Sequence, residues 1–192
     1  MNKLILASSS VYRRALLDTL QLPYECISPD IDESARPGES AETLVRRLAL
    51  EKAQAVARHT PNALVIGSDQ VAVLDGDIIG KPLTHDKARA QLLRASGRSV
   101  RFVTGLCLLN SNSRHSQVDA IDFQVHFRTL TEQQINRYLE REQPYQCAGS
   151  FKSEGLGIAL FERLEGDDPN SLIGLPLIRL VRMLENAGVQ VL

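Results

Sequence analysis

The sequence lacks the features that mark several classes of protein. Its 192 residues include three cysteines, Cys26, Cys107 and Cys147, and this odd and widely spaced set predicts reduced thiols rather than disulfides. No apolar run approaches the roughly 20 residues that a membrane-spanning helix needs. The apolar residues 4–7 near the start are too few for the core of a signal peptide. We therefore expect a cytoplasmic protein with no membrane partner.

An excess of charge of either sign is also missing. The chain has 22 Lys and Arg against 23 Asp and Glu, which gives a formal net charge of −1. Such a near-neutral chain is a poor candidate for non-specific binding to nucleic acid. The four histidines share no zinc-binding spacing with the cysteines. A chain of this length buries roughly 70% of the surface that it exposes when unfolded, so it can fold without a metal or a disulfide.

Several common catalytic motifs are absent as well. The chain has no Gly-x-Ser-x-Gly elbow and no Ser-x-x-Lys sequence. Gly80-Lys81-Pro82 resembles the end of a phosphate-binding P-loop, but Pro82 stands where the magnesium-binding Ser or Thr would be. No third glycine follows Gly155-Leu156-Gly157 at the spacing of a dinucleotide-binding loop. An ordinary P-loop kinase and a dinucleotide-binding fold are therefore disfavoured.

The hydrophobic pattern predicts strands that alternate with helices early in the chain and a strand-rich middle. The predicted strands are 4–7, 24–27, 63–67, 71–74 paired with 78–79, 100–109, 118–127 and 155–161. The predicted helices are 13–20, 40–58 capped by Ser40, 84–95 capped by Thr84, 131–142 with a Thr131–Gln134 capping box, and a last helix from Pro176 to Gly188. This order predicts an α/β fold with a mixed sheet.

Two of the predicted strands run into polar residues. Residues 4–7 lead to Ser8, and residues 63–67 lead to Asp69. Ligands of open α/β sheets bind beyond the carboxyl ends of strands, and a serine cluster before a helix N-terminus favours anions. Arg13 can clamp phosphate oxygens there. The alternative is that Ser10 merely caps the helix and that the arginine is solvated.

Lys52 and a set of acids are further candidates. Lys52 shares one helical stripe with three apolar residues, so it is either a lysine that reaches out to solvent or a cation aimed at a phosphate. Asp30, Asp32 and Glu33 lie in one loop and can hold a divalent cation together with Asp69, or can be solvated. Asp69 follows an apolar strand and therefore needs a partner.

Several segments together resemble the Maf-like nucleotide pyrophosphatases. They are LILASSS at 4–10 followed by Arg13, Asp32-Glu33, Glu51-Lys52-Ala53, Gly67-Ser68-Asp69-Gln70, Gly80-Lys81-Pro82, Thr104-Gly105 and Gly149-Ser150-Phe151. The resemblance implies one Maf-like domain over residues 1–192, with an elongated mixed sheet flanked by helices, similar to the inosine-triphosphatase fold, and a cleft between two lobes. It also implies a hydrolase that cleaves nucleoside triphosphates between the α and β phosphates with a divalent cation, Mg or Mn.

The same resemblance implies roles for individual residues. Those implied to bind the substrate phosphates are Ser8, Arg13, Lys52 and Lys81. Glu33 and Asp69 are implied to serve the metal, and Asp69 is the expected general base for the attacking water. The chain departs from the family pattern at Val11 and Tyr12, where Pro and Arg are usual, which puts one phosphate or base contact in doubt.

Three residues bear on substrate preference. Tyr12, Gln70 and Glu154 resemble the family branch that prefers 7-methyl-GTP, whereas the branch that prefers dTTP and UTP is similar to Arg, Thr and Gln at these places. Methylation at N7 makes guanine cationic, so Tyr12 can stack on the ring and Glu154 can complement its charge. A dTTP/UTP pyrophosphatase stays open, as does a non-enzymatic regulator of cell division that binds nucleotide or nucleic acid. The balanced charge argues against a stable nucleic-acid partner, and the sequence leaves a homodimer open.

Overall fold

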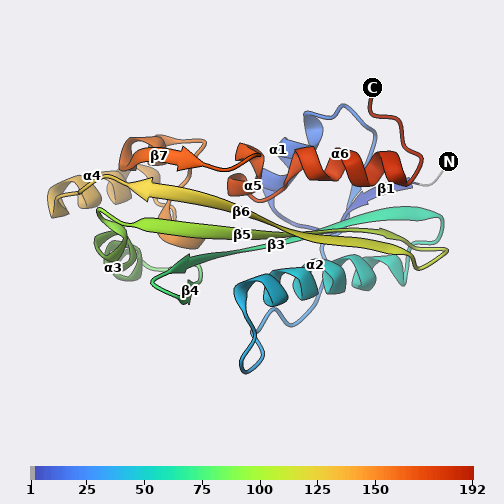
Figure 1. Cartoon of the computed structure of the whole chain (residues 1–192), viewed down its shortest axis with the longest axis horizontal. Helices are drawn as coiled ribbons and strands as arrows, with labels where there is room; N and C mark the ends of the chain where they lie inside the picture. The colour runs from blue at the N-terminus through green and yellow to red at the C-terminus, as the bar shows by residue number, and fades with distance from the viewer. Residues whose placement is uncertain (1–2) are drawn as a thin grey trace. The chain divides into compact units, whose positions relative to one another are not determined.

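The fold is a mixed α/β arrangement, as the sequence predicts. The structure is a computed structural model that describes residues 3–192. Its seven-stranded sheet has the order β2-β1-β3-β5-β6-β7, with β4 paired to β3 (Figure 1). The strands are β1 (Lys3–Leu6), β2 (Glu25–Cys26), β3 (Ala63–Leu74), β4 (Asp77–Ile79), β5 (Ser99–Asn110), β6 (Ser116–Phe127) and β7 (Phe161–Glu165). The sheet is mixed because β1 pairs in parallel with β2 and β3, whereas β4 and β7 pair antiparallel with their neighbours.

The helices flank this sheet. They are α1 (Val11–Asp18), α2 (Ala41–Ala57), α3 (His85–Ala95), α4 (Glu132–Glu142), α5 (Pro169–Ile173) and α6 (Leu177–Asn186). Two short 3-10 segments are η1 (Ala148–Ser150) and η2 (Leu156–Leu160). None of the helices that the structure describes is long and apolar enough to cross a membrane.

The chain divides into two compact units. The first comprises residues 1–70, 104–121 and 168–192, and the second comprises residues 71–103 and 122–167. The three long strands β3, β5 and β6 each contribute residues to both units. Each unit is described by itself below.

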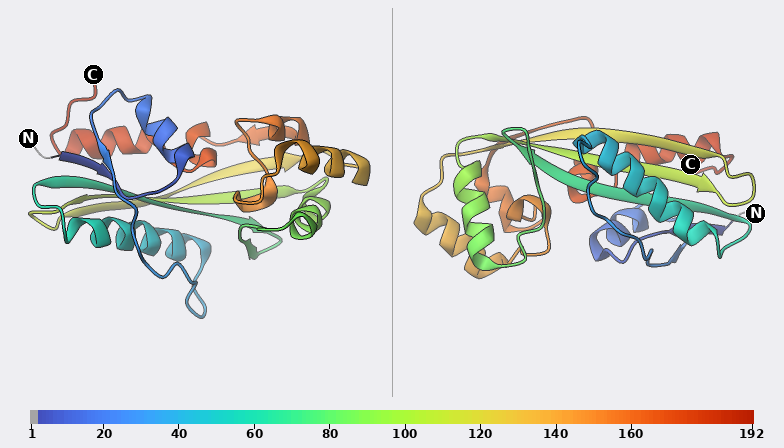
Figure 2. Two further views of the ribbon diagram at one scale, coloured as in Figure 1. Left: turned by 180° about the vertical axis from the view of Figure 1, so that it is seen from behind. Right: turned by 90° about the horizontal axis from the view of Figure 1, so that it is seen from below.

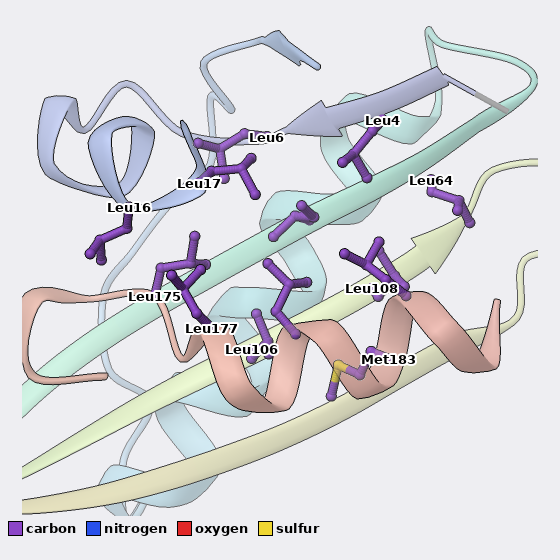
Figure 3. Close-up of a cluster of buried hydrophobic side chains, with 13 residues drawn as sticks. Leu4, Leu6, Leu16, Leu17, Leu64, Leu106, Leu108, Leu175, Leu177 and Met183 are labelled. Atoms are coloured by element: carbon purple, nitrogen blue, oxygen red, sulfur yellow. The ribbon is translucent and has the colours of Figure 1, made fainter. Parts of the chain in front are cut away.

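In the first unit, helices cover both faces of the strands. α2 lies on one face, and α1 and α6 lie on the other (Figure 2). Successive side chains of a strand point to opposite faces, and β1 follows this rule: Leu4 and Leu6 pack in the cluster that contains α1 and α6, whereas Ile5 packs in the cluster that contains α2. Figure 3 shows the first of these clusters, which includes Met183 of α6 and Leu106 and Leu108 of β5. Burial on both faces explains why β1 and the first half of β3 are nearly continuous apolar runs.

The second unit has its own core. α3 packs against α4 and η1, and η2 packs against α4. Four phenylalanine rings meet edge to face with centroid separations of 4.8 to 5.7 Å: Phe102, Phe127, Phe151 and Phe161. Aromatic pairs prefer this geometry, and it adds stabilisation beyond the burial of their surface.

The predicted helix caps and the tight turn are confirmed, whereas the first helix spans Val11–Asp18 and not the predicted 13–20. Ser40, Thr84 and Thr131 cap α2, α3 and α4, and both hydrogen bonds of the capping box between Thr131 and Gln134 are present. Pro176 is the N-cap of α6. The hairpin of β3 and β4 pairs residues 72–74 with 77–79. Local sequence signals of this kind are reliable because caps and tight turns are satisfied within a few residues.

Two predictions about strands are wrong. Residues 155–161 do not form one glycine-rich strand: η2 occupies Leu156–Leu160, and β7 begins at Phe161. A short apolar run fits a buried helical turn as well as a strand, and a side chain at Gly157 would lie 2.2 Å from the Lys152 carbonyl oxygen. The strand predicted at 63–67 does not end before Ser68, because β3 continues to Leu74 and Asp69 lies within it. Asp69 is therefore part of the sheet rather than of a loop beyond a strand end.

Candidate functional site

The centre of the candidate site is a buried ion pair in the first unit. The Nζ atom of Lys52 on α2 lies 2.6 Å from Oδ1 of Asp69 on β3 and 3.0 Å from Oε1 of Glu33. Lys52 is 4% exposed and Asp69 is 6% exposed, whereas Glu33 lies in an exposed loop. Lys52 therefore does not reach out to solvent, and that alternative is wrong. The predicted need of Asp69 for a partner is confirmed.

Two glycines allow α2 to bring Lys52 to the sheet. A Cβ atom at Gly67 on β3 would lie 2.0 Å from the carbonyl oxygen of Ala49, and one at Gly105 on β5 would lie 2.1 Å from that of Val45. Both carbonyls belong to α2, so the helix backbone packs directly on these two strands at positions where any side chain would push it away. This close approach places Lys52, one turn beyond Ala49, beside Asp69.

The guanidinium of Arg13 is a second cation near these carboxylates. Ser10 caps α1 by accepting a hydrogen bond from the backbone N–H of Arg13, and the Arg13 Nε donates to the carbonyl oxygen of Gly174 at 2.8 Å. Burial lowers the pKa of Arg13, and the negative charges of Asp69 and Glu33 act in the opposite direction. The guanidinium is thus held in the electric field of the same two carboxylates rather than solvated on the helix surface. The Gly174 carbonyl also accepts from Ser68, the neighbour of Asp69, so the structure brings Arg13 close to Lys52, Glu33 and Asp69 in the first unit.

Ser8 and Tyr12 lie on the segment that leads into α1. Ser8 is buried, and its Oγ accepts a hydrogen bond from the backbone N–H of Ser10 at 3.1 Å. Tyr12 is half-buried in the first turn of the helix. The hydroxyl of Ser8 thus helps to order the turn at the N-terminus of α1, where free backbone N–H groups favour an anion.

Gln70 has a fixed orientation. Its Nε2 donates to the carbonyl oxygens of Ser171 and Leu172 at 2.8 and 3.0 Å and approaches the Thr104 Oγ1 at 3.0 Å. Carbonyl oxygens can only accept, so the nitrogen of the amide must face them. Within residues 3–192 the Oε1 atom of Gln70 makes no hydrogen bond, which leaves it as an acceptor for a ligand.

The C-terminal end of α5 organises this part of the site, and the sequence analysis did not identify it. The carbonyl oxygen of Gly174 accepts hydrogen bonds from Ser68 as well as from Arg13, at 2.9 and 2.8 Å. The carbonyl of Ser171 accepts a further hydrogen bond from the Thr104 hydroxyl at 2.9 Å. The last carbonyls of a helix have no partner within the helix. α5 therefore offers acceptors that hold donors of two strands, β3 and β5, and of α1.

Asp168 anchors α5 itself. This residue is 3% exposed, and its Oδ1 accepts from the backbone and side-chain nitrogens of Asn170 at 2.9 Å. Its Oδ2 accepts from the backbone N–H of Ile178 at 2.8 Å, which ties α5 to α6. The sequence did contain the signal, because Asp followed by Pro169 is an N-cap followed by proline at the first helical position.

Two of the predicted site residues, Lys81 and Glu154, belong to the second unit. Lys81 is exposed in the segment between β4 and α3. Glu154 is exposed, and its Oε2 lies 3.5 Å from the Ser153 hydroxyl. Their implied roles therefore stay predictions.

The acids of the first unit suit a hard divalent cation that a substrate helps to hold. Residues 3–192 contain no group of three His, Cys, Asp or Glu side chains arranged for a metal. Glu33 and Asp69 nevertheless both contact the ammonium group of Lys52. Within the described chain, Oδ2 of Asp69 makes no hydrogen bond. Magnesium is commonly held by one or two carboxylates together with substrate phosphates, so this pair fits such an ion, whereas Asp30 and Asp32 lie outside it.

Comparisons with known proteins show which family the chain resembles. The family model described as Maf-like protein matches residues 3–187. A protein of Pseudomonas fluorescens Pf-5 named 7-methyl-GTP pyrophosphatase is 64% identical over 190 residues, which cover 99% of each chain. Proteins of the same name from Pseudomonas aeruginosa PAO1 and Nitrosococcus oceani are 63% and 61% identical, over 100% and 98% of this chain and 100% and 95% of their own lengths.

Proposed function

We propose that this chain, which belongs to the Maf-like protein family, hydrolyses a nucleoside triphosphate between its α and β phosphates, with 7-methyl-GTP as its preferred substrate. The three relatives described above carry that name and are 61 to 64% identical over nearly their full lengths. The observation that carries the proposal is the buried Lys52–Asp69 pair with Arg13 and Glu33 around it. It combines cations for a phosphate chain with a carboxylate for water.

The first part of the mechanism is charge neutralisation. Phosphoryl transfer needs little covalent help from the protein and depends on positioning and on cations near the phosphate oxygens. Lys52 and Arg13 supply two such cations in a poorly solvated setting, where their attraction for phosphate is stronger than in water. Ser8 and the N-terminus of α1 add hydrogen-bond donors, and Lys81 has the phosphate-binding role that the family resemblance gives it.

The second part is activation of water by Asp69. Its Oδ1 is held by Lys52, which fixes the carboxylate plane and leaves Oδ2 free to accept a proton from the attacking water. The water oxygen bonds to the α phosphorus as the bond from that phosphorus to the bridging oxygen breaks, and pyrophosphate leaves with the electron pair. Glu33 and Asp69 would hold a divalent cation, Mg or Mn, which when bound supplies further positive charge to the phosphate oxygens.

Recognition of the base is the third part. The Oε1 atom of Gln70 can accept a hydrogen bond from an N–H group on the guanine edge, because its amide nitrogen is committed to the α5 carbonyls. An aromatic ring at Tyr12 suits a cationic 7-methylguanine, and a carboxylate at Glu154 complements that charge. These residues support a preference for 7-methyl-GTP over dTTP and UTP.

The test is a panel of triphosphates assayed with Mg and with Mn. The purified protein is incubated with 7-methyl-GTP, GTP, dTTP or UTP, and the nucleoside monophosphate and pyrophosphate are measured. We expect 7-methyl-GMP and pyrophosphate in equal amounts, with kcat/KM higher for 7-methyl-GTP than for dTTP. Faster dTTP turnover would overturn the substrate preference but keep the reaction.

A second outcome would overturn the enzymatic proposal altogether. If no triphosphate is hydrolysed while the protein binds duplex DNA in a salt-dependent manner, a regulator that binds nucleic acid is the better account.

The three cysteines, none of which is in a disulfide in the structure, support a cytoplasmic location for the enzyme.

A further inference from the structure

The second unit contains a pocket outside the candidate site described above. Its volume is about 160 Å³. One side is formed by Gln134, Arg137, Tyr138 and Arg141 of α4, and the remainder includes Arg128 and residues of η2. Pockets for nucleotides and drug-sized ligands commonly have volumes of about 300–1,000 Å³. The pocket therefore suits a small ligand rather than a whole nucleotide.

The arginines that line this pocket are the unpaired arginines of the second unit. Arg128, Arg137 and Arg141 make no side-chain hydrogen bond and no ion pair with any residue in the described part of the chain. Every other arginine of this unit pairs with a carboxylate: Arg89 with Glu132, Arg94 with Asp77, Arg98 with Asp75, Arg101 with Asp122 and Arg163 with Glu165. Three cations without a protein counterion thus gather at one place, in a chain whose net charge is −1.

The spacing of two of these arginines on α4 is electrostatically unfavourable unless an anion binds between them. Arg137 and Arg141 are four residues apart on α4, where like charges repel. No carboxylate is among the residues that line the pocket. Gln134 adds a donor, because its Oε1 is used in the capping box with Thr131 while its Nε2 makes no hydrogen bond within residues 3–192. The pocket is therefore lined by hydrogen-bond donors, three charged and one neutral, and by no negatively charged acceptor.

The interior of the pocket is apolar. Leu130, Tyr138 and Leu160 are 7%, 4% and 3% exposed, so they form its buried side, whereas the three arginines are exposed and form its rim. Apolar surroundings reduce the screening of charge by water and strengthen the attraction between a guanidinium and an anion. Guanidinium groups bind phosphate oxygens through two parallel N–H donors.

We propose that this pocket is a binding site for a small inorganic phosphate anion, either orthophosphate or pyrophosphate. The three guanidinium groups hold the phosphate oxygens, and Gln134 donates one neutral hydrogen bond. The volume of the pocket is below the range that is usual for a whole nucleotide. This site does not depend on the proposed hydrolytic function, because none of its residues is assigned to that reaction.

The test is calorimetric titration of the full chain with sodium pyrophosphate and, separately, with sodium orthophosphate, in the absence of divalent metal. The variant R137A/R141A removes two of the three cations from an exposed helix face, and alanine is a better helix former than arginine, so folding is retained and is checked by circular dichroism. R89A/R163A is the matched control, because it removes the same amount of charge from the same unit at arginines that already have carboxylate partners. Both variants leave the candidate active site intact.

We expect R137A/R141A to bind at least one of the two anions ten or more times more weakly than the unaltered protein, while R89A/R163A binds it within a factor of three. Tighter binding of pyrophosphate would identify it as the ligand, and tighter binding of orthophosphate would identify that ion instead. Equal affinities in all three proteins, or an equal loss in both variants, would overturn the proposal, since binding would then occur elsewhere or follow net charge alone.

Discussion

The ammonium of Lys52 lies 2.6 Å from the carboxylate of Asp69, and both side chains are buried. These residues are 17 positions apart in the chain, one on α2 and one on β3. Burial of two charges is costly unless they are paired, and removal of one partner leaves the other charge uncompensated. The pair therefore contributes both to the stability of the first unit and to the chemistry proposed for it.

Replacement of Asp69 tests its role as general base. D69N keeps the size of the side chain and an oxygen that can accept from Lys52, and Glu33 still faces the ammonium, so the protein should fold. Its melting temperature should be lower than that of the unaltered protein, because Lys52 loses one of its two counterions. Its kcat for 7-methyl-GTP should fall by about 10²–10⁴-fold, the usual contribution of a general base. The measurement is steady-state release of pyrophosphate. Turnover close to that of the unaltered enzyme would exclude Asp69 as the base.

Replacement of Lys52 tests the energetic coupling of the pair. K52M leaves the Asp69 carboxylate buried without its cation, and we expect the free energy of unfolding to fall by about 3 kcal/mol. In the double variant K52M/D69L neither charge of the pair remains, so part of that loss should be recovered. Urea unfolding is measured for four proteins: the unaltered protein, K52M, D69L and the double variant. A loss of stability in the double variant that equals or exceeds the sum of the two single losses would contradict the coupling.

The glycine at position 67 should be indispensable for the position of α2. G67A places a methyl group against the carbonyl of Ala49, so α2 must move away from β3, and we expect a loss of about 1–3 kcal/mol in unfolding free energy. The matched control is G80A, where a Cβ atom would meet nothing within 4 Å. Thermal unfolding compares the two variants. Equal stability of G67A and G80A would argue against close packing of α2 on the sheet.

Glu39 should make stability depend on pH in the acid range. Arg47 donates to both oxygens of Glu39 at 2.7 Å, and these hydrogen bonds, together with one from the backbone of Arg36, lower the pKa of Glu39 from 4.5 to about 2. Because the folded pKa lies below the unfolded value, the stabilisation is complete above about pH 4.5 and is lost as the pH falls through about 2.

The measurement is the melting temperature of E39Q relative to the unaltered protein across this range. E39Q should be less stable at pH 7, and the difference should shrink as the pH falls toward 2. E140Q serves as a control for the change of charge, because Glu140 is exposed on α4 and pairs with no described residue. A difference that stays constant from pH 7 to pH 2 would refute the assignment.

Asp168 should stabilise the turn that holds Arg13 and Gln70. D168A removes the N-cap of α5 and the acceptor of the Ile178 N–H, and loss of such a cap costs about 1–2 kcal/mol. The catalytic efficiency should fall as well, because the α5 carbonyls position Arg13 and Gln70. D167A alters the adjacent exposed acid and should change stability by less than about 0.5 kcal/mol. The two variants are compared by urea unfolding for stability and by kcat/KM for catalytic efficiency.

The sequence by itself determined the elements whose signals are local. The caps at Ser40, Thr84 and Thr131 and the hairpin around Asp75-Gly76 depend on neighbours within a few residues, and the structure confirms them. The run at 155–161 was predicted wrongly, because periodicity in a short apolar stretch does not separate a strand from helical turns. The family was also evident from ordered short motifs spread over the chain.

Only the tertiary structure decided how the site is supported. The sequence showed that Lys52 lay on an apolar stripe and that Asp69 needed a partner, but their pairing depends on contact between two glycines and the backbone of α2. The anchoring of Gln70 and Arg13 by α5 carbonyls joins residues about 100 to 160 positions apart. Backbone carbonyls are the same in every sequence, so no pattern of side chains reveals which of them will face a given donor until the chain is packed.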